Sequence, residues 1–252
     1  MELLVIALIA FTSAVLSGLL GLGGAVILIP AYLYLPQMFG LSPLSVPHVS
    51  GMTSMQVLVS SIAGMMIHGA KGTVDKRLVL SMGIPMTITA FAGAYLSKDV
   101  SPHAVLTIFG TMALFSAVIL LIRNAAEDQK TEFQFSFTRA VVIASVVGFF
   151  GGIVGAAGAF LLAPLMMIIL KIPTRITIGS TLGIVIFSSA AASVGKLTTE
   201  QIPAAETIAA IAGAIPGMIA GSRMSHKAQP ASLRIVLALL IASVGIGMII
   251  KV

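Results

Sequence analysis

Cysteine is absent from this chain, and charged residues are scarce. Without cysteine, the 252-residue protein can form no disulfide bond and no thiolate metal site. Charged residues make up 9% of the sequence, against about 25% in a typical soluble globular protein. So few charges cannot cover a surface that faces water. The composition therefore excludes a soluble enzyme, a nucleic-acid-binding protein and a disordered chain.

Several chemical signatures are missing as well. The sequence contains no HExxH metalloprotease motif, no Walker A lysine loop and no GxSxG motif. We therefore expect no enzyme activity, no cofactor and no bound metal. The apolar runs carry no carboxylate near their middle, so coupling to protons or sodium through a buried Asp/Glu relay lacks its usual carrier. The N-terminus has no basic segment before its first apolar run, so we expect no cleavable signal peptide.

Most of the chain consists of long apolar runs. Residues of the apolar types make up 58% of the chain, which predicts an all-α, polytopic transmembrane bundle. The uncharged runs are Leu3–Leu35, Val49–Ile67, Leu78–Ser97, His103–Ile122, Ala140–Leu170, Ile176–Gly195, Thr207–Ser222 and Ile235–Ile250. As one helix, Leu3–Leu35 would be about 50 Å long, against about 30 Å of hydrocarbon in a bilayer. Ala140–Leu170 is also too long for a single crossing.

The two overlong runs share a pattern of glycines followed by a proline. This pattern is Gly18, Gly21, Gly24 and Pro30 in the first run and Gly152, Gly155, Gly158 and Pro164 in the second. Glycine lets the backbone reverse and proline interrupts helical hydrogen bonding, so we interpret each run as a hairpin or broken helix. Gly18, Pro30, Gly152 and Pro164 are the predicted hinge positions.

The shared pattern predicts an internal repeat. Thr53-Ser54-Met55 also recurs, as Ser180-Thr181-Leu182. We predict a first transmembrane repeat at residues 1–122, a polar cytoplasmic linker at 123–137 and a second transmembrane repeat at 138–252.

Positive charges indicate how the repeats are oriented. If each long run is a hairpin, three basic residues (Lys98, Lys196 and Lys251) fall on one side of the membrane. Eleven fall on the other side: Lys71, Lys76, Arg77, Arg123, Lys130, Arg139, Lys171, Arg175, Arg223, Lys227 and Arg234. This asymmetry is expected of cytoplasmic loops, whereas single crossings would give eight against six. Each half then has a hairpin plus three crossings, so the halves are inverted and both termini lie outside. Inverted repeats with broken helices are typical of secondary transporters.

The hairpin tips are the predicted anion site. A half-helix begins after each glycine cluster, and a helix start offers unpaired N–H groups and about half a positive charge. Glycine lets an anion approach that backbone closely. The candidate substrate-binding residues there are Gly21, Gly23, Gly24, Ala25, Gly155, Gly158 and Ala159. The alternative is that these small residues only allow close helix packing.

Polar side chains follow each hairpin and extend the candidate site. They are Thr53, Ser54 and Gln56 in the first half and Ser180 and Thr181 in the second. Buried hydroxyls can donate to an oxyanion, although they can also bond to their own helix carbonyls. An amide is costly to leave in lipid, so we expect Gln56 to face a partner or a cavity. His48 and His68 bracket one crossing, where they are either gates or interfacial residues.

The motifs together resemble those of the TauE/SafE sulfite exporter family, also called the 4-toluene sulfonate uptake permease family. The resemblance rests on Gly18–Pro30 with its echo Gly152–Pro164, on Thr53-Ser54-Met55 and Gly179–Leu182, and on His68, Gly72, Val74 and Asp75, which follow an H-x-x-x-G-x-V-D pattern. It covers the whole chain in order. It departs at Ala25, Ala157 and Ala159, where alanine replaces glycine. The resemblance implies transport of small sulfur-containing anions such as sulfite, sulfoacetate or other organosulfonates.

Two alternatives to a secondary transporter stay open. One is a passive anion channel on the same scaffold, and the other is a membrane scaffold or sensor that transports nothing. As a transporter, the protein would bind a small anion between the hairpin tips by alternating access, in a bacterial inner membrane. We expect a lipid bilayer and the anion as partners and no nucleic acid. Monomer and homodimer both remain possible.

Overall fold

Each overlong apolar run is broken into a longer and a shorter helix. The computed structural model describes residues 2–20, 25–69, 72–122, 136–156, 158–225, 239 and 241–247. The first run forms α1 (Glu2–Leu20) and α2 (Ala25–Met38), and the second forms α6 (Phe137–Val154) and α7 (Ala159–Ile168). At 1.5 Å per residue, α1 and α6 are about 27 to 28 Å long, whereas α2 and α7 reach only about 21 and 15 Å. The prediction of broken helices is confirmed.

The remaining helices are long. They are α3 (Val46–Gly69), α4 (Lys76–Leu96), α5 (Pro102–Ile122), α8 (Thr174–Thr198) and α9 (Ala204–Ser225), with a 3₁₀ turn, η1 (Ser97–Asp99), after α4. Seven helices in the described part of the chain are long and apolar enough to cross a membrane: α1, α3, α4, α5, α6, α8 and α9. The predicted all-helical transmembrane bundle is therefore confirmed, and residues 2–20, 25–69, 72–122, 136–156 and 158–225 contain no strand.

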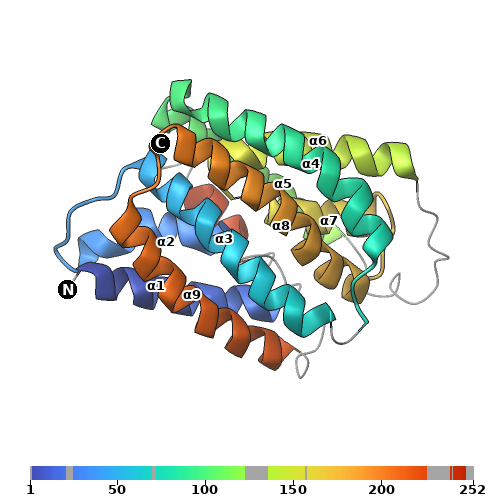
Figure 1. Cartoon of the computed structure of the whole chain (residues 1–252), viewed down its shortest axis with the longest axis horizontal. Coiled ribbons are helices and arrows are strands. Elements are labelled where there is room, and N and C mark those ends of the chain that lie inside the picture. Colours follow the sequence, from blue (N-terminus) through green and yellow to red (C-terminus); the bar gives the residue numbers. More distant parts are fainter. Residues whose placement is uncertain are drawn as a thin grey trace.

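The helices run along the long axis of the molecule in two opposite senses (Figure 1). In that view α1, α3 and α9 run from left to right, whereas α4, α6 and α8 run from right to left. The connection from α2 to α3 lies at the left end, and the connection from α7 to α8 lies at the right end. Each broken helix therefore returns toward the end from which it began.

Glycines allow two pairs of helices from different parts of the chain to pack closely. Helix α1 packs against α9, and α6 packs against α4. A Cβ atom added at Gly93 of α4 would collide with the carbonyl oxygen of Phe149 in α6, and one added at Gly221 of α9 would collide with that of Val15 in α1. The two contacts are equivalent under the predicted repeat, because Val15 and Phe149 differ by the same shift as Gly18 and Gly152.

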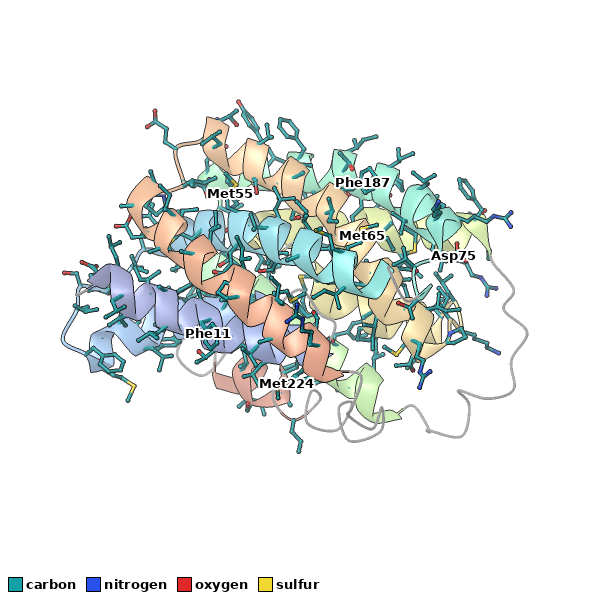
Figure 2. All side chains as sticks on the ribbon, turned by 60° about the horizontal axis from the view of Figure 1, so that its bottom comes forward. Phe11, Met55, Met65, Asp75, Phe187 and Met224 are labelled. Carbon is teal, nitrogen blue, oxygen red and sulfur yellow. The ribbon has the colours of Figure 1, made fainter. Side chains whose placement is uncertain are left out.

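Basic residues concentrate at one end of the bundle. At the end where α4, α6 and α8 begin and α9 ends, the described basic residues are Lys76, Arg77, Arg139, Lys171, Arg175 and Arg223. Lys98 and Lys196 lie at the opposite end, where α4 and α8 terminate. Figure 2 shows side chains tipped with nitrogen gathered mainly around the end where Asp75 is labelled. We call these the basic end and the opposite end.

Candidate functional site

The break between α6 and α7 is built from two glycines in the left-handed region of backbone space. Gly155 ends α6 with a φ of 81°, and its N–H donates to the carbonyl of Gly151 at 2.9 Å. Gly158, with a φ of 66°, stands directly before α7. Residues with a Cβ rarely adopt such angles, which explains why glycine marks this break. Ala157 lies outside the described residues.

Helix α3 lies directly against this break. A Cβ added at Gly155 would collide with the carbonyl oxygen of Ser50. The Ser50 hydroxyl donates to the carbonyl oxygen of Ile153 at 3.4 Å. The Ser54 hydroxyl has two acceptors for its one hydrogen, the carbonyl oxygen of Gly155 at 3.2 Å and that of Ser50 in its own helix at 3.0 Å. Both serines are buried. The polar segment that follows the first hairpin therefore holds the break of the second, and the candidate residues Ser54 and Gly155 are brought together.

Gln56 joins α3 to the short helix α2. The hydroxyl of Tyr32 in α2 donates to Oε1 of Gln56, and both side chains are fully buried. The amide nitrogen Nε2 of Gln56 has no hydrogen-bond acceptor among the described residues. A buried amide donor without an acceptor costs about 1–3 kcal/mol. The side chain of Gln56 therefore has one hydrogen-bond partner, Tyr32, and a second polar atom, Nε2, that is free to donate to a ligand.

The remaining candidate hydroxyls are buried but already bonded. Thr53 donates to the carbonyl of Val49 in its own helix at 2.6 Å, which is the alternative role that the sequence left open. Ser180 accepts a hydrogen bond from the backbone N–H of Asp75 at 2.9 Å, toward the basic end. Thr181 contacts the sulfur of Met166 in α7 at 3.5 Å. Of these three, only Thr181 contacts a short helix.

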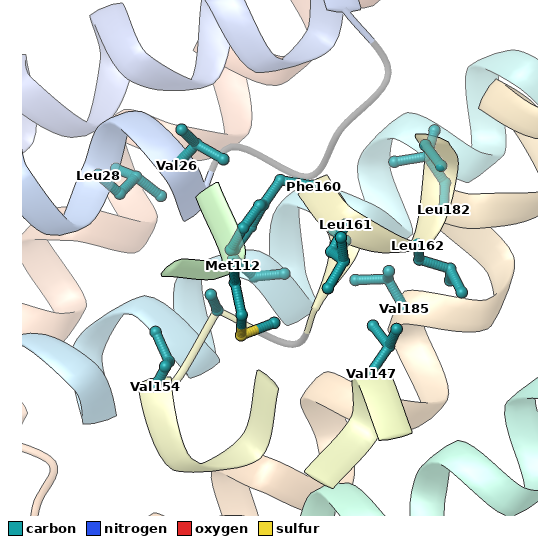
Figure 3. Packing of buried hydrophobic residues seen from close by; sticks show 14 of the residues in the cluster. Val26, Leu28, Met112, Val147, Val154, Phe160, Leu161, Leu162, Leu182 and Val185 are labelled. Carbon is teal, nitrogen blue, oxygen red and sulfur yellow. The ribbon is translucent and has the colours of Figure 1, made fainter. Parts of the chain in front are cut away.

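The two short helices contact each other in the interior. Helices α2 and α7 are in contact, and Val26 and Phe160, one residue inside each helix, belong to the same buried cluster. Figure 3 shows the two side chains near each other in the packed interior. Ala159 is fully buried at the first position of α7. Of the first break, Gly21, Gly23 and Gly24 lie outside the described residues, as does the side chain of Ala25.

The predicted hinge residues lie inside helices. Gly18 in α1 packs against the backbone of Ser222, and a Cβ added at Gly152 in α6 would collide with the carbonyl oxygen of Ala90. Pro30 lies within α2 and Pro164 within α7. Both glycines therefore serve close helix packing here, and the second break begins three residues after Gly152.

His48 and His68 lie near the two ends of α3. His48 is exposed, and its backbone N–H donates to the hydroxyl of Ser45 at 3.4 Å. The side chain of His68 lies outside the described residues. The described residues contain no group of three His, Cys, Asp or Glu side chains that could hold a metal ion.

Lys196 is a polar residue of the interior that the sequence interpretation missed. We placed it in an outer loop, because an uncharged run ends at Gly195, but α8 continues to Thr198 and buries Lys196 to 1% exposure. Its ammonium donates to the Ser97 hydroxyl at 2.7 Å, to Gln201 Oε1 at 3.0 Å and to the Ile153 carbonyl at 3.1 Å. Its position in the repeat, equivalent to His68 in α3, was a signal that it belongs to a helix.

Comparison with known proteins agrees with this architecture. Residues 6–248 match the family described as "Sulfite exporter TauE/SafE". The "Probable membrane transporter protein YunE" of Bacillus subtilis is 24% identical over 99% of this chain and 98% of its own. A "Probable membrane transporter protein" of Xylella fastidiosa is 27% identical over 72% of this chain and 67% of its own. "Probable membrane transporter protein MJ0441" of Methanocaldococcus jannaschii is 20% identical over 96% of this chain and 94% of its own.

No solved structure matches the chain significantly. The family match spans both broken helices and all seven candidate membrane-crossing helices of the described residues. This chain is therefore a multi-pass membrane transporter that belongs to the sulfite exporter TauE/SafE family.

Proposed function

We propose that the protein is a secondary transporter of small sulfur-containing oxyanions, such as sulfite, sulfoacetate or other organosulfonates, and that it works by alternating access. The anion would bind where α2 and α7 begin, between the two breaks. The observation that carries this proposal is the unpaired amide Nε2 of Gln56, buried on α3 and tied through Oε1 to Tyr32 of α2.

The chemistry of this region favours an anion over a cation. A helix start offers backbone N–H donors and a positive partial charge, and α2 and α7, two helices in contact, provide two such starts. Gln56 adds a buried side-chain donor beside Tyr32, about 10 Å along α2 from its first residue. Among the described residues, no carboxylate is buried. The site therefore offers donors without the negative side chains that a metal cation or an ammonium group would need.

The sulfur assignment comes from the family and not from the geometry. The family that the chain matches is described as "Sulfite exporter TauE/SafE". A sulfonate or sulfite group presents several oxygen acceptors around one centre, which suits donors that converge from two helix starts. We expect this headgroup to contribute more to binding than the rest of the molecule does.

An inverted arrangement of two repeats fits the observed directions of the helices. The predicted counterparts α1 and α6 run in opposite senses in Figure 1, as do α3 and α8 and also α4 and α9. The basic end would face the cytoplasm of a bacterial inner membrane, since positively charged loops stay inside. Helix α1 begins at the opposite end, which supports a chain that starts outside.

The moving parts would not be the two sequence halves. Helix α9 of the second repeat packs with α1 and α3 of the first, and α4 of the first repeat packs with α6 and α8 of the second. The two repeats have therefore exchanged α4 and α9. We define bundle 1 as α1, α2, α3 and α9, and bundle 2 as α4, α5, α6, α7 and α8. The main contact between the bundles is α3 against α8. Rocking at this contact would expose the starts of α2 and α7 alternately to the two sides.

A ligand-stabilisation screen tests the proposal. The purified protein in detergent is heated with sulfite, thiosulfate, sulfoacetate, taurine, sulfate or carboxylates, and Tm is measured. We expect sulfur oxyanions to raise Tm in the wild type and in Gln37→Leu, a control whose exposed amide bonds to Leu33 of its own helix. Gln56→Leu should lose most of that increase. Stabilisation by carboxylates alone would overturn the sulfur assignment, and an equal increase in Gln56→Leu would overturn the site.

A further inference from the structure

A small cleft lies at the opposite end of the bundle, separate from the contact between α2 and α7. About 200 Å³ between its lining residues is not filled by atoms, part of it open to the outside, and the enclosed part has room for about one water molecule. Its polar lining consists of Ser50, Ser97, Lys196 and Gln201, and its apolar lining comes from the residues around the starts of α3 and α5, among them Val46 and Val105. All four polar side chains are at least 95% buried. The cleft thus gathers a cation, two hydroxyls and an amide from α3, α8, the turn η1 and the segment that follows α8.

Lys196 brings a charge into this cleft that no described side chain balances. An ammonium group has three hydrogens and no acceptor, and here all three hydrogens meet neutral oxygens, those of Ser97, Ile153 and Gln201. No carboxylate is buried among the described residues and none lines the cleft. Burying a charge without an opposite charge is costly, even when its hydrogen bonds are satisfied.

The end of α6 offsets part of this cost. Ile153 lies in the last turn of α6, where the helix carbonyls carry a negative partial charge, and Lys196 donates to one of these carbonyls. That partial charge is about half of one electron charge at most, so the ammonium keeps a net positive field toward the cleft. Local stabilisation of the helix end therefore does not account for the whole arrangement.

The neighbours of Lys196 can also serve a ligand. The Ser97 hydroxyl accepts from Lys196, donates to the carbonyl of Ala94 at 2.6 Å, and lies 3.2 Å from the Gln201 amide nitrogen. That amide nitrogen also donates to Thr199. A rotation of the Gln201 side chain would free one hydrogen of Lys196 and leave its own amide group facing the cleft. The donors needed for an oxyanion are then present, and the cleft must widen from the size of one water molecule to admit it.

We propose that this cleft is a second anion site, in which Lys196, Ser97, Gln201 and Ser50 bind one small oxyanion near the opposite end of the bundle. The identity of the anion rests on the proposed function, whereas the site itself rests on the buried lysine and the cleft. Nothing in the comparisons assigns this site.

The position of the cleft makes it a stage on the way to the break. The carbonyl of Ile153 accepts from both Lys196 and Ser50, and one turn further along α3, Ser54 donates to Gly155 at the break itself. The cleft and the break are thus linked by hydrogen bonds through Ile153 and two serines of α3. Release from, or entry to, the opposite end of the bundle would pass this lysine.

Titration of the purified protein with sulfite, followed by calorimetry, tests the proposal. The variant is Lys196→Gln, which keeps hydrogen-bonding capacity and removes the charge. The matched control is Lys98→Gln, because Lys98 lies at the same end but stands exposed over the ring of Tyr95 at 4.6 Å. We expect two classes of sites in the wild type and in Lys98→Gln. In Lys196→Gln we expect the loss of one class and a KM for sulfite transport at least tenfold higher.

Ser97→Ala is a second variant, which keeps Lys196 and tests the same site in case Lys196→Gln does not fold. It should weaken the same class of sites about fivefold and leave the other class unchanged. Two wild-type-like classes in folded Lys196→Gln, or in folded Ser97→Ala, would overturn the second site while leaving the proposed function intact. Loss of both classes in Gln56→Leu would also overturn it, because independent sites do not vanish together. A wild type that binds no sulfite would overturn both proposals.

Discussion

The hydroxyl of Ser54 lies 3.2 Å from the carbonyl oxygen of Gly155, so a side chain of α3 holds the point at which α6 ends. Because that carbonyl is buried, removing the donor leaves it without this partner. We expect Ser54→Ala to cost about 1–3 kcal/mol of stability and to slow transport, since the break would lose its fixed position. Thermal unfolding and flux in vesicles measure the two effects.

Thr111→Ala is the matched control for Ser54→Ala. Thr111 is exposed, and its hydroxyl bonds only to the carbonyl of Thr107 one turn earlier in the same helix. This substitution should change stability by less than about 0.5 kcal/mol. Equal effects of the two substitutions would show that the contact between Ser54 and Gly155 has no special role.

Gly155 should tolerate no side chain. Its φ of 81° already disfavours one, and a Cβ there would also collide with the carbonyl oxygen of Ser50. Gly40 isolates the first cost, because it has a φ of 71° with no atom near its Cβ position. We expect Gly40→Ala to cost about 1–2 kcal/mol and Gly155→Ala clearly more, both measured by thermal unfolding. Comparable costs would mean that α3 does not press on the break as described.

The two glycine contacts between helices should behave as a pair. Gly93→Ala and Gly221→Ala each place a methyl group against a backbone carbonyl, of Phe149 and of Val15 respectively. Each should cost about 1–3 kcal/mol, since helix backbones cannot move apart without losing packing. Gly247→Ala, whose Cβ position has no atom of the described residues within 4 Å, should be close to neutral or slightly stabilising. If only one of the two substitutions were neutral, the contact of α4 with α6 and that of α1 with α9 would not be equivalent.

Because the chain has no cysteine, engineered pairs of cysteines can test whether the two bundles move against each other without reactions of native thiols. A disulfide between Gly64→Cys in α3 and Leu182→Cys in α8 would join bundle 1 to bundle 2, because the side chain of Leu182 packs against Gly64, with its Cδ1 atom 3.2 Å from the Gly64 Cβ position. We expect oxidation of this pair to stop transport and reduction to restore it.

The control disulfide lies within bundle 2. It joins Ala94→Cys in α4 to Gly195→Cys in α8, where the two Cβ positions are 2.9 Å apart. Oxidation of this pair should leave transport largely intact, because α4 and α8 move together. If the two halves of the sequence moved as units instead, the second disulfide would also inhibit, since it joins one half to the other.

The sequence predicted the parts of the fold that follow from local physics. Glycine clusters located the broken helices because few other residues adopt the backbone of Gly155, and run length revealed that Ala140–Leu170 could not be one helix. The uneven distribution of basic residues matches the basic end. The offset of the second repeat was less well determined. The glycine contacts relate Gly51 to Gly179, one position away from the pairing of Thr53 with Ser180 that the hydroxyl pattern suggested.

Features that depend on distant contacts could not be predicted. The packing of α9 on α1 and of α4 on α6 involves helices far apart in the chain, and no local pattern encodes such a pairing. The burial of Lys196 depends on Ser97, Ile153 and Gln201 meeting at one point. A lysine near a helix end otherwise extends to the membrane surface.

Flux of radiolabelled sulfite into proteoliposomes tests the central claim most directly, because it measures transport and the role of the unpaired Gln56 amide together. The wild type and Gln37→Leu should take up sulfite, and unlabelled sulfite inside the vesicles should accelerate that uptake, as alternating access requires. Gln56→Leu, with the same Tm as the wild type in the absence of ligand, should take up sulfite at least tenfold more slowly than the wild type at low sulfite concentration. Uptake in Gln56→Leu equal to that of the wild type, or no uptake of any sulfur oxyanion by the wild type, would contradict the account.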